Sequence, residues 1–211
     1  MNKLVLLGTG VFAEEIADVV SDCPDVELVG FAENLDRERA ASPLLDLPVH
    51  WIEDLPDLEG CEFVCAIGTT KRSAFTRQVA ALGLPFGRVV HPTARLSRTS
   101  ELGAGSILNV GVMVAAHTRI GEHVIVNRGA LIGHHTTIGD HVTISPGSNI
   151  GGRVTIGDGA YIGMGSIVLN DVKIGAGSIV GAGAVVTKDV PERVQVLGIP
   201  ARVTKENVEP H

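Results

Sequence analysis

The sequence is poor in aromatic residues. Only 3% of its 211 residues are Phe, Trp or Tyr, although 45% are hydrophobic and 26 are glycine. A globular core of ordinary shape uses more large rings than this. We therefore expect a narrow, regular interior built from Val, Ile, Leu and Ala.

Other shortages narrow the possible functions. The formal net charge of −7 at pH 7 argues against a broad nucleic-acid-binding or membrane-binding surface. No apolar run reaches the ~18 residues of a membrane span, and the opening MNKLVLLGTG lacks a signal-peptide cleavage site. The cysteines, Cys23, Cys61 and Cys65, form no C-x-x-C pair and suit buried, reduced thiols. These features predict a cytoplasmic protein without nucleic-acid partners or membrane insertion.

A repeat with a period of six fills the second part of the chain. Every sixth residue from Val90 to Val186 is Val, Leu or Ile, and the residue four positions after each is Ala, Ser, Thr or Val. The position directly after the aliphatic residue is often Gly or Asn, which tolerate a positive φ angle in a turn. A helix would need a period of 3.6 and a lone strand a period of 2. The repeat therefore predicts short strands that meet at corners.

The first part of the chain follows another pattern. Three apolar segments typical of strands, KLVLLGTG, VELVGFAEN and EFVCAIGTT, are interspersed with two amphipathic segments typical of helices, FAEEIADVVSD and KRSAFTRQVAALG. This order predicts a parallel sheet with helices packed on it. We expect an α/β Rossmann-like domain over residues 1–88 and the repeat domain over residues 89–211.

A glycine loop follows the first predicted strand. Residues 8–13, GTGVFA, match G-x-G-x-x-A, and Glu33 ends the second strand, as in a dinucleotide fingerprint. However, residues 1–88 have room for only about half of a two-lobed dinucleotide fold. A nucleotide sugar or another phosphorylated ligand at the helix N-terminus fits better than NAD, and a purely structural turn is the alternative.

The combination resembles the bacterial sugar-nucleotide N-acetyltransferase and sialic acid O-acetyltransferase family. The resemblance spans the chain and rests on GTG, GFAEN, AIGTT, VVHPTA, GAGAVVTKDV, GIPARV and the N-x6-H pair formed by Asn127 and His134. It implies a left-handed parallel β-helix in which three hexads make one triangular coil. Residues eighteen apart then stack about 4.8 Å apart along the axis.

The resemblance also implies a reaction. It is acetyl transfer from acetyl-CoA to the amino group of a nucleotide-linked, UDP-type sugar, with His134 as general base and Asn127 as its family partner. The N–H of Gly152, stacked over His134, is the candidate oxyanion donor. The family's CoA positions correspond to Thr143, Gly152, Met164 and Ala182. Its nucleotide-sugar positions correspond to Gly10, Val11, Phe12, Glu33, Asn34, Gly68 and Thr69.

Three residues depart from the family pattern. His135 stands where the family usually has Asp or Glu to support the base, and a neutral imidazole is a weaker hydrogen-bond acceptor. Thr143 and Phe12 replace histidines that some members carry near the acetyl group and the sugar nucleotide. These changes affect the predicted identity of the acceptor sugar more than the predicted type of reaction.

The repeat register also predicts assembly. His134 and Gly152 share one column of the β-helix, and Met164 and Ala182 share another, so a groove between neighbouring subunits can use both. This favours a cyclic homotrimer with sites between subunits. Other histidines stack in pairs, which are too few ligands for structural zinc, so no metal is expected.

Two other functions fit the same residues. One is O-acetylation of sialic acid or a related sugar, since one histidine can deprotonate an amine or a hydroxyl. The other is a catalytically silent trimeric scaffold or ligand sensor, against which the Asn127–His134 pair and the glycine loop count.

Overall fold

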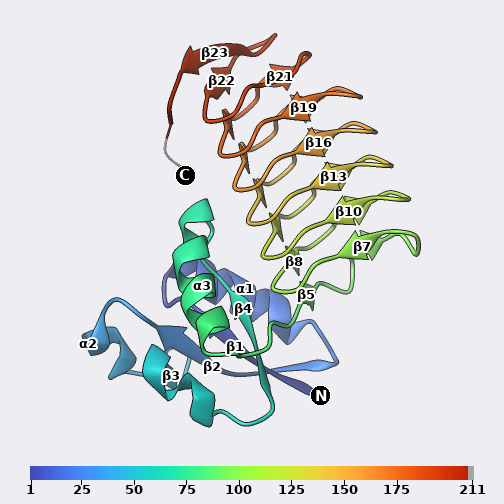
Figure 1. The fold of residues 1–211 in the computed structure, drawn as a ribbon. Coiled ribbons are helices and arrows are strands. Elements are labelled where there is room, and N and C mark those ends of the chain that lie inside the picture. The colour runs from blue at the N-terminus through green and yellow to red at the C-terminus, as the bar shows by residue number, and fades with distance from the viewer. Residues whose placement is uncertain (209–211) are drawn as a thin grey trace.

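The structure is a computed structural model, and it describes residues 1–208. A small α/β layer lies at one end of a long β-helix, whose coils rise from it one above another (Figure 1). No helix in the described residues has the length and apolar character needed to cross a membrane.

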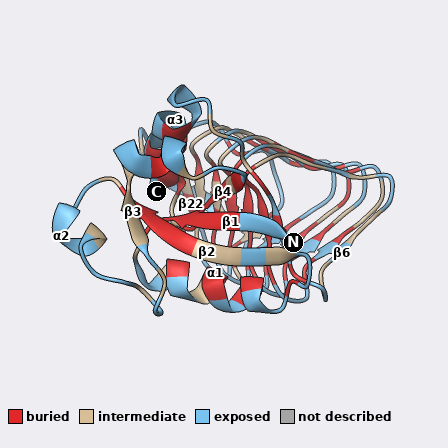
Figure 2. Cartoon of the chain, turned by 90° about the horizontal axis from the view of Figure 1, so that it is seen from below, coloured by how far each residue is buried: buried red, intermediate tan, exposed pale blue. Residues whose placement is uncertain are grey.

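The α/β layer is built on four parallel strands in the order β3-β2-β1-β4. Their bounds are β1 (Asn2–Leu7), β2 (Val26–Glu33), β3 (Val49–Trp51) and β4 (Cys61–Cys65). Residues 4–7 of the central strand β1 are all apolar and buried, because helices or loops cover both faces of this part of the strand. Figure 2 shows the later part of β1 buried in the middle of this layer and its first residues exposed. Helices α1 (Val11–Ser21) and α3 (Ser73–Ala81) pack on it, as expected from the sequence.

Four short elements were not predicted. They are α2 (Arg37–Ala40), the strand β3, and the 3-10 segments η1 (Ile52–Asp57) and η2 (Thr70–Arg72). β3 is too short to show a periodicity of its own and is held by pairing with β2, Phe31 opposite Val49. The segment η2 takes the first residues of the helix predicted from KRSAFTRQVAALG.

The repeat forms a triangular prism with three faces. The docking face carries β5 (Val89–Val90), β8 (Ile107–Leu108), β11 (Ile125–Val126), β14 (Thr143–Ile144), β17 (Tyr161–Ile162), β20 (Ile179–Val180), β22 (Gln195–Leu197) and β23 (Arg202–Lys205). The open face carries β6 (Arg95–Leu96), β9 (Met113–Val114), β12 (Leu131–Ile132), β15 (Asn149–Ile150), β18 (Ile167–Val168) and β21 (Val185–Val186). The third face carries β7 (Glu101–Leu102), β10 (Arg119–Ile120), β13 (Thr137–Ile138), β16 (Thr155–Ile156) and β19 (Lys173–Ile174).

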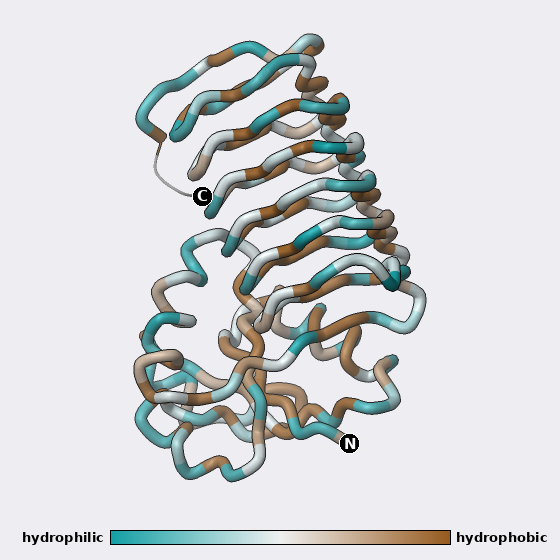
Figure 3. Tube along the Cα trace, turned by 45° about the vertical axis from the view of Figure 1, so that its right-hand side comes forward, coloured by the Kyte–Doolittle hydropathy of each residue, from teal (hydrophilic) through white to brown (hydrophobic). Residues whose placement is uncertain are grey.

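The chain turns at three corners in each coil. Corner 1 joins the docking face to the open face, corner 2 joins the open face to the third face, and corner 3 returns to the docking face. Within the repeat the strands pair in parallel with a constant offset, for example Ile120 with Ile138. The aliphatic column fills the interior, and apolar segments recur along every coil in Figure 3. The predicted stacking is confirmed, since the His117 and His135 ring centroids lie 4.8 Å apart.

One expectation about the corners was wrong. The positive φ angle falls three positions after the aliphatic residue, as at His123 (φ 55) and His135 (φ 57), and not directly after it. At the directly following Gly163, an added Cβ would lie 2.6 Å from the carbonyl oxygen of Val180 in the next coil. Glycine is needed there because neighbouring coils approach closely. The left-handed turn position holds another glycine in most corners and histidine in these two.

The two units share part of their cores. Ile107 and Ile125 point outward from the docking face, yet they are buried because Leu6 and Ile16 of the α/β layer belong to the same cluster. Polar contacts frame this apolar junction. Arg128 donates to Glu15 of α1 at 2.7 Å, and His91 Nε2 lies 3.0 Å from Asp22 Oδ2.

Two stacked histidines at corner 3 complete the junction. The rings of His123 and His141 lie 4.9 Å apart, Phe86 meets His123 edge-on, and Thr76 Oγ1 of α3 lies 2.9 Å from His141 Nε2. Burial, with the charges of a protonated His141 and of Arg72, lowers the pKa of His123 from 6.5 to about 4. The imidazole of His123 is therefore neutral in the folded protein.

We predict that this pKa depression makes the fold sensitive to mild acid. The unfolded chain takes up a proton on His123 near pH 6.5, but the folded chain does so only near pH 4, so stability is complete above 6.5 and falls between these values. The pKa shift is worth roughly 3 kcal/mol at most. In His123→Asn, which keeps a residue tolerant of positive φ, the loss of unfolding free energy from pH 7 to pH 5 should shrink. An unchanged pH dependence in denaturant titrations would contradict this.

Candidate active site

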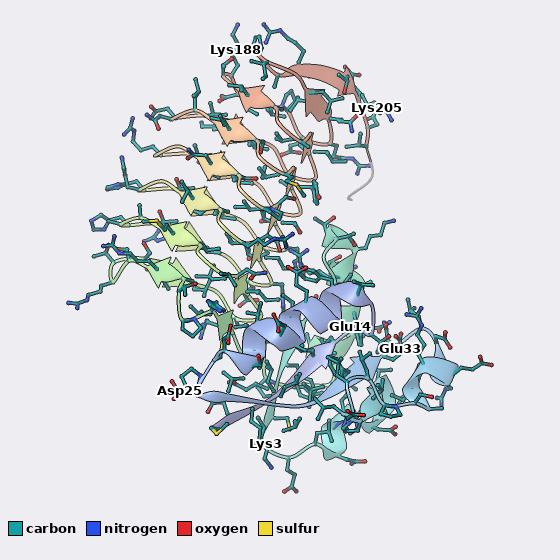
Figure 4. All side chains as sticks on the ribbon, turned by 180° about the vertical axis from the view of Figure 1, so that it is seen from behind. Lys3, Glu14, Asp25, Glu33, Lys188 and Lys205 are labelled. Carbon is teal, nitrogen blue, oxygen red and sulfur yellow. The ribbon has the colours of Figure 1, made fainter. Side chains whose placement is uncertain are left out.

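The predicted nucleotide-sugar residues lie around the carboxyl ends of β1, β2 and β4. Gly10 precedes α1 in an extended conformation, and Val11, 83% exposed, opens its first turn. Phe12 packs on Gly68, where an added Cβ would lie 3.5 Å from the ring. Figure 4 shows Glu33 and Glu14 of α1 at the same edge of the layer, away from Lys3 and Asp25. The structure thus brings the glycine loop and the ends of β2 and β4 together.

The Glu33 carboxylate is already hydrogen-bonded to neighbouring groups of the protein. Its carboxylate accepts hydrogen bonds from the Thr9 hydroxyl at 2.5 Å and from the Asn34 and Leu35 amides at 2.9 Å. Burial alone would raise the pKa of Glu33, but these hydrogen bonds outweigh it and hold the pKa below its usual value. A dinucleotide site needs this carboxylate for a ribose hydroxyl. Its engagement within the loop counts against NAD.

His134 lies on corner 2 and is exposed. Its Nδ1 lies 3.0 Å from Nδ1 of His135. Its other nitrogen, Nε2, faces Gly152 on the next coil, where an added Cβ would lie only 2.8 Å away. Only glycine at 152 leaves room for this ring position.

The Nδ1–Nδ1 contact constrains the protons of both rings. A hydrogen bond between two ring nitrogens needs one donor and one acceptor. If His134 donates from Nδ1, the lone pair of its Nε2 is free to accept a proton above Gly152. His135 then does for His134 what a carboxylate would do, as a neutral acceptor.

Other predicted residues lie elsewhere in the chain. Asn127 is buried at corner 1, and the exposed Met164 and Ala182 lie at the same corner on later coils, so one chain does not bring them to His134. Thr143 is buried on the docking face, where its hydroxyl accepts a hydrogen bond from Arg72 at 2.7 Å. Burial against the α/β layer does not favour Thr143 as a CoA contact.

The amide of Gly152, the predicted oxyanion donor, already has a partner. It donates to Asn170 Oδ1 at 2.8 Å. Asn170 was not predicted, although the repeat register places it eighteen positions after Gly152 and so directly above it (170 − 152 = 18). To bind an oxyanion, Gly152 would have to exchange this side-chain acceptor for the ligand.

The open face separates the His134 corner from the Met164 corner. It exposes Met113 (46%) on β9, Leu131 (40%) on β12 and Ile167 (41%) on β18. Strand β15, with Asn149 in the same position, lies between β12 and β18. A shallow hollow of about 400 Å³ lies along this face, lined by Met113, Leu131 and the start of corner 2. Within residues 1–208 no three His, Cys, Asp or Glu side chains are placed to hold a metal ion.

Comparison with known proteins agrees with this architecture. The family described as "Bacterial transferase hexapeptide (six repeats)" matches residues 117–152, 135–168 and 153–188, which makes the repeat domain that of a hexapeptide transferase. PerB from Caulobacter crescentus, solved with CoA and GDP-perosamine, is 31% identical over 97% of this chain and 98% of its own, with a TM-score of 0.85. The chain belongs to the bacterial sugar-nucleotide N-acetyltransferase and sialic acid O-acetyltransferase family, and the predicted fold class is confirmed.

Other solved structures are similar over the whole chain. The acetyltransferase domain of PglB from Neisseria gonorrhoeae FA1090, in complex with acetyl coenzyme A, is 28% identical over 96% of this chain and 99% of its own, with a TM-score of 0.88. WeeI from Acinetobacter baumannii AYE is 29% identical over 95% of this chain and 99% of its own, with a TM-score of 0.86. No curated protein sequence matches this chain.

Proposed function

We propose that this protein transfers the acetyl group of acetyl-CoA to the amino group of a nucleotide-linked amino sugar. The main observation that supports this proposal is the position of His134, whose Nε2 faces Gly152 while its Nδ1 contacts His135. Support comes from similar structures that hold CoA with GDP-perosamine, or acetyl coenzyme A. A UDP-type nucleotide remains our prediction, and the glycine loop with Gly68 and Thr69 is its proposed site.

In the proposed reaction the sugar amine attacks the thioester carbonyl carbon. The new C–N bond forms, and the amine proton passes to His134 Nε2. The C–S bond breaks to release the CoA thiolate, which takes up that proton from His134 and so regenerates the base. A thioester is activated enough that no covalent enzyme intermediate is needed. His135 accepts from Nδ1–H of His134 and so stabilises the imidazolium that forms.

We further propose a homotrimer. The open face lies between the corner of His134 and the corner of Met164, and a neighbouring subunit packed on its exposed apolar side chains would bring the two corners together. Asn127 would join His134 from the neighbouring chain in the same way. This reconciles the separation of these residues within one chain with a single CoA groove.

We expect His134→Ala to abolish most turnover. Loss of a general base typically costs about 10²- to 10⁴-fold in rate, while acetyl-CoA affinity should stay near that of the wild type. The test is CoA thiol release from acetyl-CoA across a panel of UDP- and GDP-linked amino sugars. His117→Ala, at the same corner one coil earlier, is the matched control and should stay active. An equal loss in both variants would refute the assignment of the base.

His135→Asp should move the pH profile. A carboxylate beside His134 stabilises its protonated form more than a neutral imidazole does. The acidic limb of kcat/KM should therefore shift to higher pH, with faster turnover above neutrality. If the limb stays in place, position 135 does not couple to the base.

Leu131→Asp should separate the subunits. A charge on the open face would oppose burial of that face between subunits. Light scattering should give a trimer for the wild type and smaller species for the variant, which should lose activity while its circular dichroism spectrum is unchanged. A fully active wild-type monomer would rule out both the trimer and the shared groove.

A further inference from the structure

Arg72 is the largest fully buried side chain in the structure, with 1% of its surface exposed. It lies in η2, directly after the Gly68–Thr69 loop and before α3, which stands beside the lower coils of the β-helix (Figure 1). A buried cation is costly unless its hydrogen bonds are satisfied. Its contacts therefore indicate what it does.

The guanidinium joins the two units through the fork of its nitrogens. Nε donates to the His123 carbonyl at 2.8 Å, and Nη2 donates to the Val142 carbonyl at 2.8 Å. Nη1 donates to the Thr143 hydroxyl at 2.7 Å and to the Thr69 carbonyl at 2.9 Å. One side chain thus holds two successive coils and the loop at the end of β4.

Thr143 reinforces the same connection. Its hydroxyl donates to the Gly68 carbonyl at 3.4 Å while it accepts from Arg72. Val142 and Thr143 follow His134 within the same turn of the β-helix, separated from it by the single strand β13. The loop proposed for the nucleotide is therefore tied to the coil that carries the proposed base.

The acceptors of Arg72 are all neutral. They are three carbonyls and one hydroxyl, and burial lowers the pKa of Arg72 to about 10, with the neighbouring Cys65 thiol opposing that shift. A buried charge is a poor source of stability compared with apolar packing of similar size. With its donors engaged and its surface covered, Arg72 does not touch a substrate.

We infer that Arg72 is a positioning residue that fixes the nucleotide loop, residues 68–69, at a set distance from the coil of His134. The inference rests on the proposed function. Its loss frees the loop, so the nucleotide sugar is held less well and its amine meets the base less often. The proposed acetyl-CoA groove should keep its affinity, because Arg72 contacts corner 3 at His123 and Val142. Of the proposed CoA residues, Met164 and Ala182 lie at corner 1 on later coils, and Gly152 lies at corner 2.

The test compares Arg72→Met, Arg72→Lys and Thr143→Val with the wild type. Arg77→Met is the matched control, because Arg77 is exposed on α3, the helix that directly follows η2. We expect Arg72→Met to raise the KM of the nucleotide sugar about tenfold, because binding must then order a loop that Arg72 already holds in the wild type. The KM of acetyl-CoA should not change. Thr143→Val should act in the same direction but less.

Lysine distinguishes geometry from charge. Its ammonium is a single point and lacks the planar fork that reaches three segments at once. Arg72→Lys should therefore fail to restore the wild-type KM. Full rescue of the wild-type KM by Arg72→Lys would overturn the positioning role. A fall in the kcat of Arg72→Met with both KM values unchanged would also overturn it, because that result indicates only a smaller folded fraction.

Hydrogen exchange separates this inference from the proposed function. If no nucleotide sugar is acetylated by the wild type, the proposed function fails, but exchange of the amides in residues 66–71 still reports on the connection. These amides should exchange faster in Arg72→Met than in the wild type or Arg77→Met, under conditions where all three are folded. Equal exchange in the three proteins would overturn the inference.

Discussion

The stacking of each coil on the one before it is the constraint on which the structure depends. Backbone hydrogen bonds run from coil to coil, and glycines such as Gly163 let neighbouring backbones approach more closely than any Cβ would allow. The offset between coils is therefore fixed, and side chains in the same hexad position stand in columns. A histidine, a glycine and an asparagine at positions 134, 152 and 170 become neighbours for this reason alone.

This constraint explains how much the sequence predicted. Within the repeat, distance along the chain converts directly into distance in space, so the His134–Gly152 contact and the histidine stacks followed from counting. The corner geometry did not, because a glycine required by close approach and one required by a positive φ look the same in a hexad pattern. His123 and His135 hold the left-handed turn where glycine was expected to do so.

The junction between the units could not be predicted by counting. Arg72 contacts His123 and Val142, which are far from it along the chain. Because Arg72 lies outside the repeat, no regular spacing in the sequence predicts these contacts. Thr143 was identified from the sequence as a family CoA position and as a departure from the family pattern, but not as a contact of Arg72. The structure supplies a reason for a threonine there. A hydroxyl there can accept from a guanidinium and donate to a carbonyl at once, which a neutral imidazole does only through two different nitrogens.

The β-helix is thus the rigid part of the molecule, whereas the position of the α/β layer depends on its contacts with the β-helix. The β-helix fixes His134, the proposed base, against Gly152 through backbone hydrogen bonds from coil to coil. The loop proposed to bind the nucleotide, residues 68–69, belongs to the separate α/β layer. Its position relative to His134 depends on side-chain contacts across one apolar junction. A general base acts only on a proton within hydrogen-bond reach. If His134 is the base, its distance from the sugar amine is accordingly set at that junction, by neutral oxygens around the buried Arg72, rather than within the coil that carries His134.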